Sequence, residues 1–313
     1  TVNFVRTIHK DHSIDVMLGT STYEAQWEHS YISVKDLPFN SKWHNIKSAG
    51  TEVARESWEG RDRLVSFMGR FNYSYKDKYL FTVTGRADGS SKLAQGHKWG
   101  FFPSAAIAWR VTEEGFLKDN SVINNLKLRL SYGESGNNAV DNYSTILGTS
   151  STQYDFDGTN ANGQYLNRIK NDKLGWEKSK EINLGLDFAL WGGRLAGNVE
   201  LYNKKTYDLI LSQKIPQTNG FDNVGAVNVG ATRNKGLEIG LNTVNIQTKD
   251  FSWTTNLSFA TNKNEITEIF GDSKDYPDQK LFIGQPVLVH YDYAWDGIWQ
   301  TSEKDEASKY GRV

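Results

Sequence analysis

The 313-residue sequence contains no cysteine, only 5 prolines and 2 methionines, and no long hydrophobic run. Proteins without cysteine occur both in the reducing cytosol and in the cell envelope, so this absence alone does not decide the compartment. No segment approaches the roughly 18 consecutive apolar residues of a membrane-spanning helix. Helical spans are therefore excluded, whereas a barrel of strands is not, because barrel strands are apolar only at alternate positions.

The chain also lacks a charge imbalance and a high overall hydropathy. Its formal net charge is −1, and its mean hydropathy is −0.59. A nearly neutral chain gives no electrostatic basis for a nucleic-acid partner. Aromatic residues, in contrast, make up 13% of the chain, with 10 Trp and 15 Tyr, and this excess favours an interface of some kind.

Residues 64–87 alternate between apolar and polar side chains on both sides of a polar turn at residues 76–78. Successive side chains of a β-strand point to opposite faces, so the segment is predicted to be a hairpin with one apolar and one polar face. In a soluble sandwich the apolar face packs inward, and aromatic residues are not confined to strand ends. In an outer-membrane barrel the apolar face meets lipid, the polar face lines the lumen, and Tyr or Trp marks the interface.

The same alternation predicts seven more strands, near residues 14–20, 104–110, 126–132, 182–190, 195–201, 237–241 and 251–259. With the hairpin this makes roughly nine or ten strands, each of about 9–13 residues, which is long for a soluble sheet. The predicted fold class is therefore all-β, an antiparallel transmembrane β-barrel segment.

The predicted connections alternate in length. Short turns are expected at residues 76–78, 192–193 and 248–250, with a medium one at 112–125, and long polar loops near 27–61, 89–98, 135–179, 208–233 and 262–285. Short turns on one side and long loops on the other are typical of outer-membrane barrels. The short-turn ends also gather Tyr75, Tyr79, Trp109, Trp191 and Trp253, which favours an aromatic girdle over ordinary packing.

The alternation also predicts which way each strand faces. The polar side chains expected to face the lumen are Arg70, Asn72, Arg86, Arg129, Asp187, Glu238 and Asn256. The apolar side chains expected to face lipid are Phe71, Phe81, Leu128, Leu186 and Leu257.

Several motifs, in order along the chain, resemble the barrel of SusC/RagA-type TonB-dependent transporters. They are Phe67-Met68-Gly69-Arg70-Phe71-Asn72-Tyr73, Asp77-Lys78-Tyr79-Leu80, Arg86-Ala87-Asp88-Gly89-Ser90-Ser91-Lys92, Trp99-Gly100-Phe101-Phe102-Pro103-Ser104, Leu126-Lys127-Leu128-Arg129, Trp176-Glu177, Asn234-Lys235-Gly236-Leu237-Glu238, and Gly284-Gln285-Pro286 to Asp296-Gly297-Ile298-Trp299-Gln300. The resemblance runs from about residue 10 to the end of the chain.

This resemblance implies a 22-stranded barrel that is filled by a plug and imports nutrients across the outer membrane of a Bacteroidota bacterium. It further implies a SusD-like lipoprotein lid at the extracellular mouth, energy from the TonB complex, and contact with outer-membrane lipid. No cofactor is expected, and the protein is not expected to be an enzyme.

Residues 1–313 are predicted to form part of one such barrel domain, without the plug domain and the final strands. The chain starts at Thr1-Val2-Asn3 and ends at Tyr310-Gly311-Arg312-Val313, which we interpret as an internal segment of a longer protein. An open half-barrel exposes unpaired strand edges and a lipid-facing surface, so we do not expect it to fold alone.

No group of residues predicts a catalytic or metal site convincingly. His9 and His12 are three residues apart and fall on opposite faces of a strand. Residues 155–160 are rich in Asp and Asn, as in calcium loops, but their glycine is misplaced for an EF-hand, so a polar extracellular loop is favoured. Residues 88–91 contain serines with no neighbouring base and are interpreted as a turn.

The expected substrate-binding residues are Tyr154, Asp155, Phe156, Asp157 and Tyr165, in the long loop at residues 135–179. Aromatic faces and acceptors suit sugar rings and peptides alike, and the family resemblance favours an oligosaccharide over an oligopeptide. The loop at residues 27–61, which carries Trp43 and Trp58, and the loop at 135–179 are expected to contact the lid or the substrate. The alternatives are a passive porin and a soluble all-β carbohydrate-binding or glycan-cleaving protein.

Overall fold

The computed structural model describes residues 1–40, 44–118, 120–214, 218, 221, 223–272, 274–295 and 297–309. Trp43 of the first expected long loop and Asp296 of the last motif lie outside these ranges.

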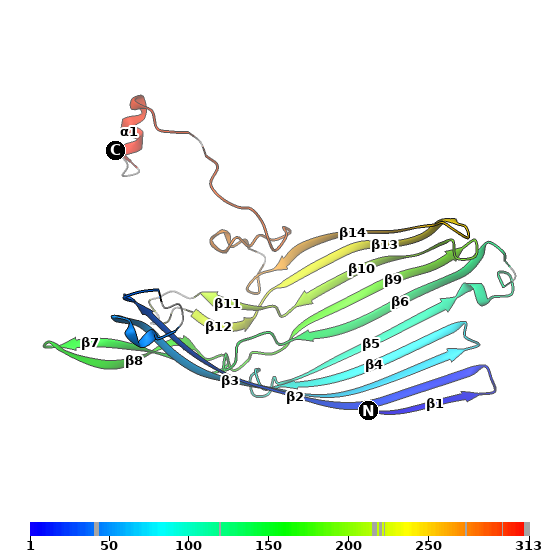
Figure 1. Ribbon diagram of the computed structural model, residues 1–313, viewed down its shortest axis with the longest axis horizontal. Helices are drawn as coiled ribbons and strands as arrows, with labels where there is room; N and C mark the ends of the chain where they lie inside the picture. The colour runs from blue at the N-terminus through cyan, green and yellow to red at the C-terminus, as the bar shows by residue number, and fades with distance from the viewer. Residues whose placement is uncertain are drawn as a thin grey trace.

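Ten antiparallel strands form one sheet in the order β1-β2-β3-β4-β5-β6-β9-β10-β13-β14 (Figure 1). Their bounds are β1 (Val2–Ile8), β2 (His12–Lys35), β3 (Thr51–Tyr75), β4 (Tyr79–Ser90), β5 (Trp99–Arg110), β6 (Ile123–Asn137), β9 (Glu177–Leu190), β10 (Leu195–Tyr207), β13 (Ala231–Gln247) and β14 (Ser252–Glu268). The large sheet has ten strands, as many as the nine or ten that the sequence predicts, although β1 was not among the segments that the alternation identified and the four strands of a second sheet were not predicted.

A second sheet of four short strands lies at one end of the large one (Figure 1). It contains β7 (Gly148–Phe156), β8 (Thr159–Ile169), β11 (Ile210–Lys214) and β12 (Asn223–Asn228). Helical turns lie at Ile46–Ser48, Val111–Glu113, Pro277–Gln279 and Thr301–Glu303, and the short helix α1 spans Lys304–Ser308. Among the described residues, no helix has the length and apolar character needed to cross a membrane.

The short connections occur where the sequence predicts them, and all lie at the same end of the large sheet (Figure 1). The turn between β3 and β4 holds Lys76 and Asp77 at φ 53° and 52°. Two successive residues with positive φ give a turn whose twist matches that of the flanking strands. His9 and Lys10 form the same kind of turn between β1 and β2.

The predicted bounds of the long loops are mostly wrong, because strands continue into them. In the segment 27–61 only residues 36–50 lie outside β2 and β3, which project as a long hairpin. The segments 135–179 and 208–233 hold the strands of the second sheet, and β14 continues to Glu268. Polar residues in these segments interrupt the hydrophobic alternation but still pair through the backbone, so their strand character was missed.

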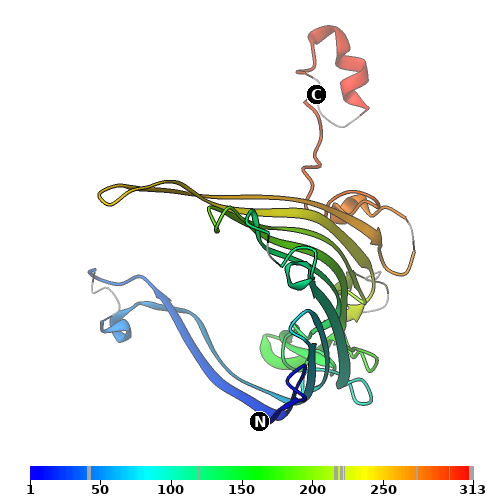
Figure 2. The same cartoon turned by 90° about the vertical axis from the view of Figure 1, so that its right-hand side faces the viewer.

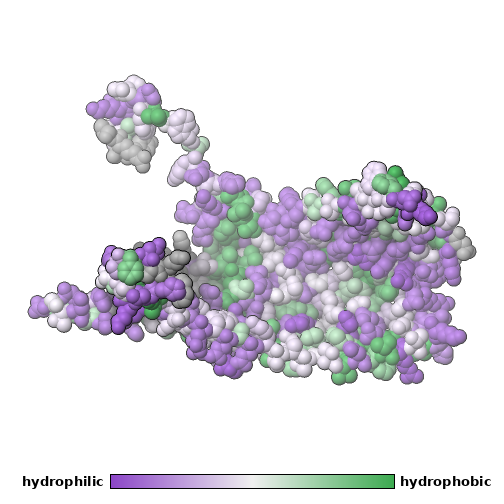
Figure 3. Space-filling model, viewed as in Figure 1, coloured by the Kyte–Doolittle hydropathy of each residue, from purple (hydrophilic) through white to green (hydrophobic). Residues whose placement is uncertain are grey.

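The large sheet curves strongly, and its two faces differ in polarity. Figure 2 shows the curved wall edge-on, and Figure 3 looks onto the concave face, which is largely hydrophilic. Large apolar side chains of the opposite, convex face are exposed, such as Phe81, Ile107, Leu130 and Leu184. The sheet therefore has the reverse polarity of a soluble half-barrel, which would pack its apolar side chains inside the curve.

The main buried cluster lies at the long-connection end. Its members are Leu93, Ala94, Phe102, Val140, Leu174 and Trp176. The Phe102 and Trp176 rings meet edge to face, with centroids 5.3 Å apart, and the Trp176 indole N–H donates to the Lys98 carbonyl at 2.9 Å. The cluster thus fastens the long connections to each other and to β5.

Candidate functional site

The structure places the seven polar residues that the sequence assigns to the lumen on one face of the large sheet. Residues directly opposite each other in adjacent strands share a face. Arg70 pairs with Thr84, which pairs with Ser104. The same correspondence continues across the sheet to Glu238, which pairs with Glu200 of β10. This common face is the concave one.

The five apolar residues expected to face lipid lie on the convex face. Phe81 pairs with Ile107, which pairs with Leu130, and Leu130 pairs with Leu184. The alternation in the sequence therefore predicted the grouping of both sets.

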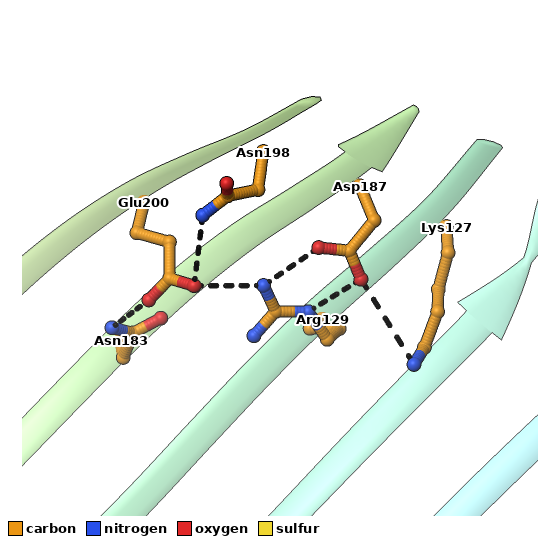
Figure 4. Close-up of polar contacts among 6 residues, drawn as sticks. All are labelled: Lys127, Arg129, Asn183, Asp187, Asn198 and Glu200. Carbon is orange, nitrogen blue, oxygen red and sulfur yellow. Dashed lines mark hydrogen bonds and ion pairs between the residues drawn. The ribbon is translucent and has the colours of Figure 1, made fainter. Parts of the chain in front are cut away.

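A network of charged and amide side chains occupies the centre of the concave face (Figure 4). Arg129 of β6 donates from Nε and Nη2 to the two oxygens of Asp187 on β9, each at 2.8 Å. Its Nη2 also donates to Glu200 Oε1 on β10 at 2.9 Å. One guanidinium thus ties three strands together, and charge-assisted bonds of this kind are the strongest available to side chains.

Amide side chains complete the network. Asn183 donates from Nδ2 to the second Glu200 oxygen at 3.1 Å, and Asn198 donates to Oε1 at 3.5 Å. Lys127 approaches Asp187, with 3.9 Å between Nζ and Oδ2. Because the carboxylates are already paired, this region offers a polar wall with few free charges.

Gly185 allows Arg129 to reach Glu200. It lies directly opposite both Arg129 and Glu200 in the register of β6, β9 and β10. A Cβ atom at this glycine would stand 2.7 Å from Arg129 Cζ. The guanidinium therefore crosses β9 in space that a side chain at position 185 would fill.

Smaller polar groups continue the concave face toward the other edge of the sheet. Asn72 donates to Asp15 Oδ2 at 3.2 Å and accepts from the Thr82 hydroxyl at 2.9 Å. Arg86 Nε donates to both oxygens of the Asp88 carboxylate at 2.8 Å. Asn72 is thus held by residues of the two neighbouring strands, and Arg86 by a carboxylate of its own strand.

Sequence reasoning did not select Glu200, Asn183, Asp15 or Asp88, although each belongs to a polar position of an alternating strand. The missing information was the register. The polar spacing marks the face, but only the pairing of strands that lie 57–71 positions apart in sequence brings Asp15 to Asn72 or Glu200 to Arg129.

The five residues predicted to bind substrate lie on the projecting hairpin of β7 and β8, and the structure divides them. Tyr154, Phe156 and Tyr165 share one face, as the pairing of Tyr154 with Ala161 and Ser150 with Tyr165 shows. The Tyr154 and Phe156 ring centroids are 6.3 Å apart. All three aromatic side chains are exposed, so they form an accessible row.

Asp155 and Asp157 help to form the turn between β7 and β8. Asp157 and Gly158 have φ of 56° and 80°, as expected for an Asp-Gly pair in a type I′ turn. Asp155 Oδ1 accepts a hydrogen bond from the Gly158 backbone N–H at 2.8 Å. This turn accounts for the Asp-rich pattern that resembled a calcium loop.

The other candidate groups have structural explanations. His9 lies in the β1–β2 turn, and His12 Nδ1 is 2.8 Å from the Tyr73 hydroxyl. Within the described ranges, no three His, Asp or Glu residues converge as a metal-binding group.

The aromatic residues expected at the short turns are gathered there. Tyr75 and Tyr79 stack across the β3–β4 turn, with centroids 6.4 Å apart, and Tyr79 pairs with Trp109. The Tyr79 hydroxyl and the Trp109 indole N–H both donate to Glu114 Oε1, at 2.7 Å and 3.2 Å. These donors lower the pKa of the Glu114 carboxyl, with Lys78 acting in the same direction.

Comparison with known proteins gives consistent matches. A family model described as TonB dependent receptor-like, beta-barrel matches residues 6–309. The chain is 40% identical over 222 residues to the TonB-dependent receptor SusC of Bacteroides thetaiotaomicron, covering 69% of this chain and 22% of that protein. It is 39% identical over 259 residues to the TonB-dependent receptor P26 of Formosa agariphila, covering 79% and 26%. The chain thus spans about a quarter of the length of these curated relatives.

Solved structures agree with these matches. The RagAB peptide transporter superposes with a TM-score of 0.80 at 25% identity, covering 91% of this chain and 32% of that one. The outer membrane transporter YddB from Escherichia coli has a TM-score of 0.53 at 10% identity, covering 86% and 34%, and shows likeness of fold alone.

Proposed function

This chain belongs to the TonB-dependent receptor-like β-barrel family, and we propose that it forms part of a transporter that takes up nutrient oligomers. It is of the SusC/RagA type and is located in the cell outer membrane. The observation that carries the proposal is the curved sheet with a polar concave face and an apolar convex face. A soluble protein would bury the apolar face, whereas a barrel wall turns it to lipid and lines a lumen with the polar one.

In this proposal residues 1–313 are one part of a single barrel domain whose plug and final strands belong to the rest of the protein. Arg70, Asn72, Arg86, Arg129, Asp187, Glu238 and Asn256 line the lumen. The aromatic residues at the short turns lie at the periplasmic interface, and the projecting hairpins are extracellular.

Energy coupling separates an active transporter from the passive porin alternative. We expect a strain lacking the gene for the complete protein to lose uptake of a fluorescently labelled nutrient oligomer. In the wild type, collapse of the proton-motive force with an uncoupler should stop uptake if the TonB complex drives it. Continued uptake in the presence of the uncoupler would favour a porin instead.

A SusD-like surface lipoprotein is the proposed partner at the extracellular side. The segments 27–61 and 135–179 carry aromatic and polar side chains on hairpins that extend beyond the main sheet (Figure 1), and this mixture suits a wet protein interface. Deletion of either segment from the complete protein should abolish co-purification of the lipoprotein while heat-modifiability shows a folded barrel. Co-purification that survives loss of both segments would contradict the partner assignment.

The proposed substrate is an oligosaccharide, bound in part by Tyr154, Phe156 and Tyr165, with Asp155 and Asp157 nearby. Exposed aromatic faces bury the apolar faces of sugar rings. The chain is 40% identical over 222 residues to SusC and 25% identical in superposition to RagAB, which is a peptide transporter. Calorimetry of the purified complete transporter with its lipoprotein, using matched panels of neutral oligosaccharides and peptides, tests the choice. Binding of peptides alone would overturn the substrate and leave the transporter proposal standing.

A further inference from the structure

The hairpin of β2 and β3 changes its polarity along its length. Near the short turn, its convex face is apolar, with Val16 opposite Phe71, and its concave face is polar, with Asp15 opposite Asn72. Beyond the pair Tyr23 and Leu64 the arrangement reverses. The convex face then carries Glu24, Gln26, Glu28, Glu59, Arg61 and Arg63, and the concave face carries Tyr23, Trp27, His29, Tyr31 and Trp58.

The charged face of this projecting part is adapted to water. Arg61 Nε donates to Glu24 Oε1 at 2.5 Å, and Arg63 Nη2 donates to the same oxygen at 3.2 Å. Arg61, followed by Arg63, lowers the pKa of the Glu24 carboxyl. Three exposed charges in contact cannot lie against lipid, so the aromatic residues opposite them are not a continuation of the membrane surface.

The aromatic face has an ordered geometry. The Trp27 side chain lies over Gly60, and a Cβ atom at Gly60 would stand 2.6 Å from Trp27 Nε1. His29 stacks on Trp58, with centroids 5.4 Å apart and ring planes 28° apart. Trp27 is 38% exposed, and Trp58 and Tyr31 are each 48% exposed. The rings are therefore oriented by their neighbours and still accessible.

We propose that Tyr23, Trp27, His29, Tyr31 and Trp58, the aromatic platform, bind a chain of neutral sugar rings, an assignment that rests on the proposed uptake function. Tyr23 and Tyr31 are eight residues apart on one strand, which places them about 27 Å apart. That length accommodates several sugar rings in a row, each with an apolar face for an aromatic ring.

The charges on this face favour a neutral ligand. Glu56, opposite Tyr31 and two residues from Trp58, is exposed and offers acceptors for sugar hydroxyls. On this face of residues 23–33 and 54–64, all of which the structure describes, no Lys or Arg occurs. The nearby Arg61 and Arg63 lie on the opposite face and are engaged by Glu24. Asp62, the other carboxylate on this face, pairs with Lys92, with 3.5 Å between Nζ and Oδ2. An acidic or sulfated glycan would therefore meet the Glu56 carboxylate and an already paired lysine.

The test measures binding to the purified complete transporter by calorimetry, with maltoheptaose, cellohexaose, xylohexaose and mannohexaose as neutral probes and hexapeptides as the comparison. Trp58→Ala and Trp27→Ala should each weaken binding of the preferred oligosaccharide about tenfold. The matched control is Ile32→Ala, an exposed apolar residue on the opposite face of the same hairpin, which should leave affinity unchanged.

A second measurement does not depend on the variants folding. In the wild type, bound oligosaccharide should protect Trp27 and Trp58 from oxidation by N-bromosuccinimide, as read by peptide mass spectrometry. Trp253, at the short-turn end, should show no change.

Unchanged affinity in both Trp variants, or unprotected Trp27 and Trp58, would overturn the platform even where uptake persists. Failure of the wild type to bind any neutral oligosaccharide would also overturn it, as would loss of peptide binding rather than sugar binding in the variants. Absence of energy-dependent uptake of any oligomer would instead remove the proposed function, so the two failures are distinguishable.

Discussion

The two halves of the β2–β3 hairpin have the same backbone and the same alternation but opposite polarity. In the half near the short turn, apolar residues such as Phe71 face outward and polar residues such as Asn72 face inward. In the projecting half, Glu24 and Arg61 face outward, and Trp27 and Trp58 face inward. Backbone pairing does not distinguish the halves. The surrounding medium accounts for the difference between the halves, because lipid excludes unpaired charge whereas water accepts it.

The largest expected effect is a difference in folding free energy between arginine substitutions at lipid-facing and at water-facing positions of the convex face. Leu186→Arg or Leu128→Arg in the complete protein should cost about 2–4 kcal/mol of folding free energy if the site lies near the bilayer midplane. Ile32→Arg, on the same face of the projecting half, should cost under ~0.5 kcal/mol. Urea titrations of folding into bilayers, read by heat-modifiability, measure both. Ser131→Arg on the concave face is the second control, and equal costs at all positions would break the comparison.

The next effect contrasts two arginine–carboxylate groups. Arg129→Ala removes the guanidinium that pairs with Asp187 and Glu200 on a half-buried wall, leaving Lys127 at 3.9 Å from Asp187 and the Asn183 amide on Glu200. We expect a loss of roughly 2–3 kcal/mol. Arg61→Ala leaves Glu24 in water with Arg63 still near it, so the unfolding midpoint should not change measurably. The same bilayer titrations test both variants. A larger loss at Arg61 would indicate that the projecting half is buried in the assembled protein.

A third contrast uses two glycines that lie beneath long side chains. Gly185→Val displaces Arg129 from its path across β9 and should destabilise the barrel by about 1–2 kcal/mol. Gly60→Val displaces Trp27 in the projecting half, and should weaken oligosaccharide binding with little change in stability. Gly133→Ala, which has room for a methyl group with its nearest neighbour at 3.4 Å, is the control. An equal loss of stability in Gly185→Val and Gly60→Val would contradict the expected difference between the two sites.

The smallest effect concerns the short-turn end. The hydrogen bonds from Tyr79 and Trp109 lower the pKa of Glu114 below its ordinary value of 4.5. A carboxyl whose pKa is lowered on folding contributes stability above the unfolded pKa and loses it as the pH falls through the folded pKa. The difference in thermal midpoint between wild type and Glu114→Gln should therefore be present at pH 7 and disappear well below pH 4.5. Glu113→Gln, which removes an exposed carboxyl next to Glu114, is the control for the loss of one negative charge in this turn.

The sequence was sufficient to predict which residues of the barrel wall lie on each face of the sheet. Alternation alone placed Arg129 and Asp187 on one face and Leu128 and Leu186 on the other, and the strand register agrees. The short turns were equally predictable, since Gly192-Gly193 interrupts two alternating segments and adopts positive φ. Such features depend on local spacing, which a sequence displays directly.

The projecting regions were less predictable. The segments 27–61 and 135–179 appeared to be loops because their polar residues lack a continuous apolar parity, yet much of each forms paired strands. The predicted substrate residues were also separated, with Tyr154 and Phe156 exposed on one face and Asp155 bound to the turn. A hairpin in water needs no apolar outer face, so the signal that identified the membrane strands was absent there.

By itself, the sequence determined the period of two, the order of short and long connections, and the motifs of the SusC/RagA type, because each is a property of neighbouring residues. Tertiary structure alone decided that Arg129 reaches Glu200 across Gly185, and that Trp27 and Trp58 share a face turned inward. These contacts depend on the register between strands that are distant in sequence. Register follows from the closure of the turns and the packing of the whole sheet, which no single strand encodes.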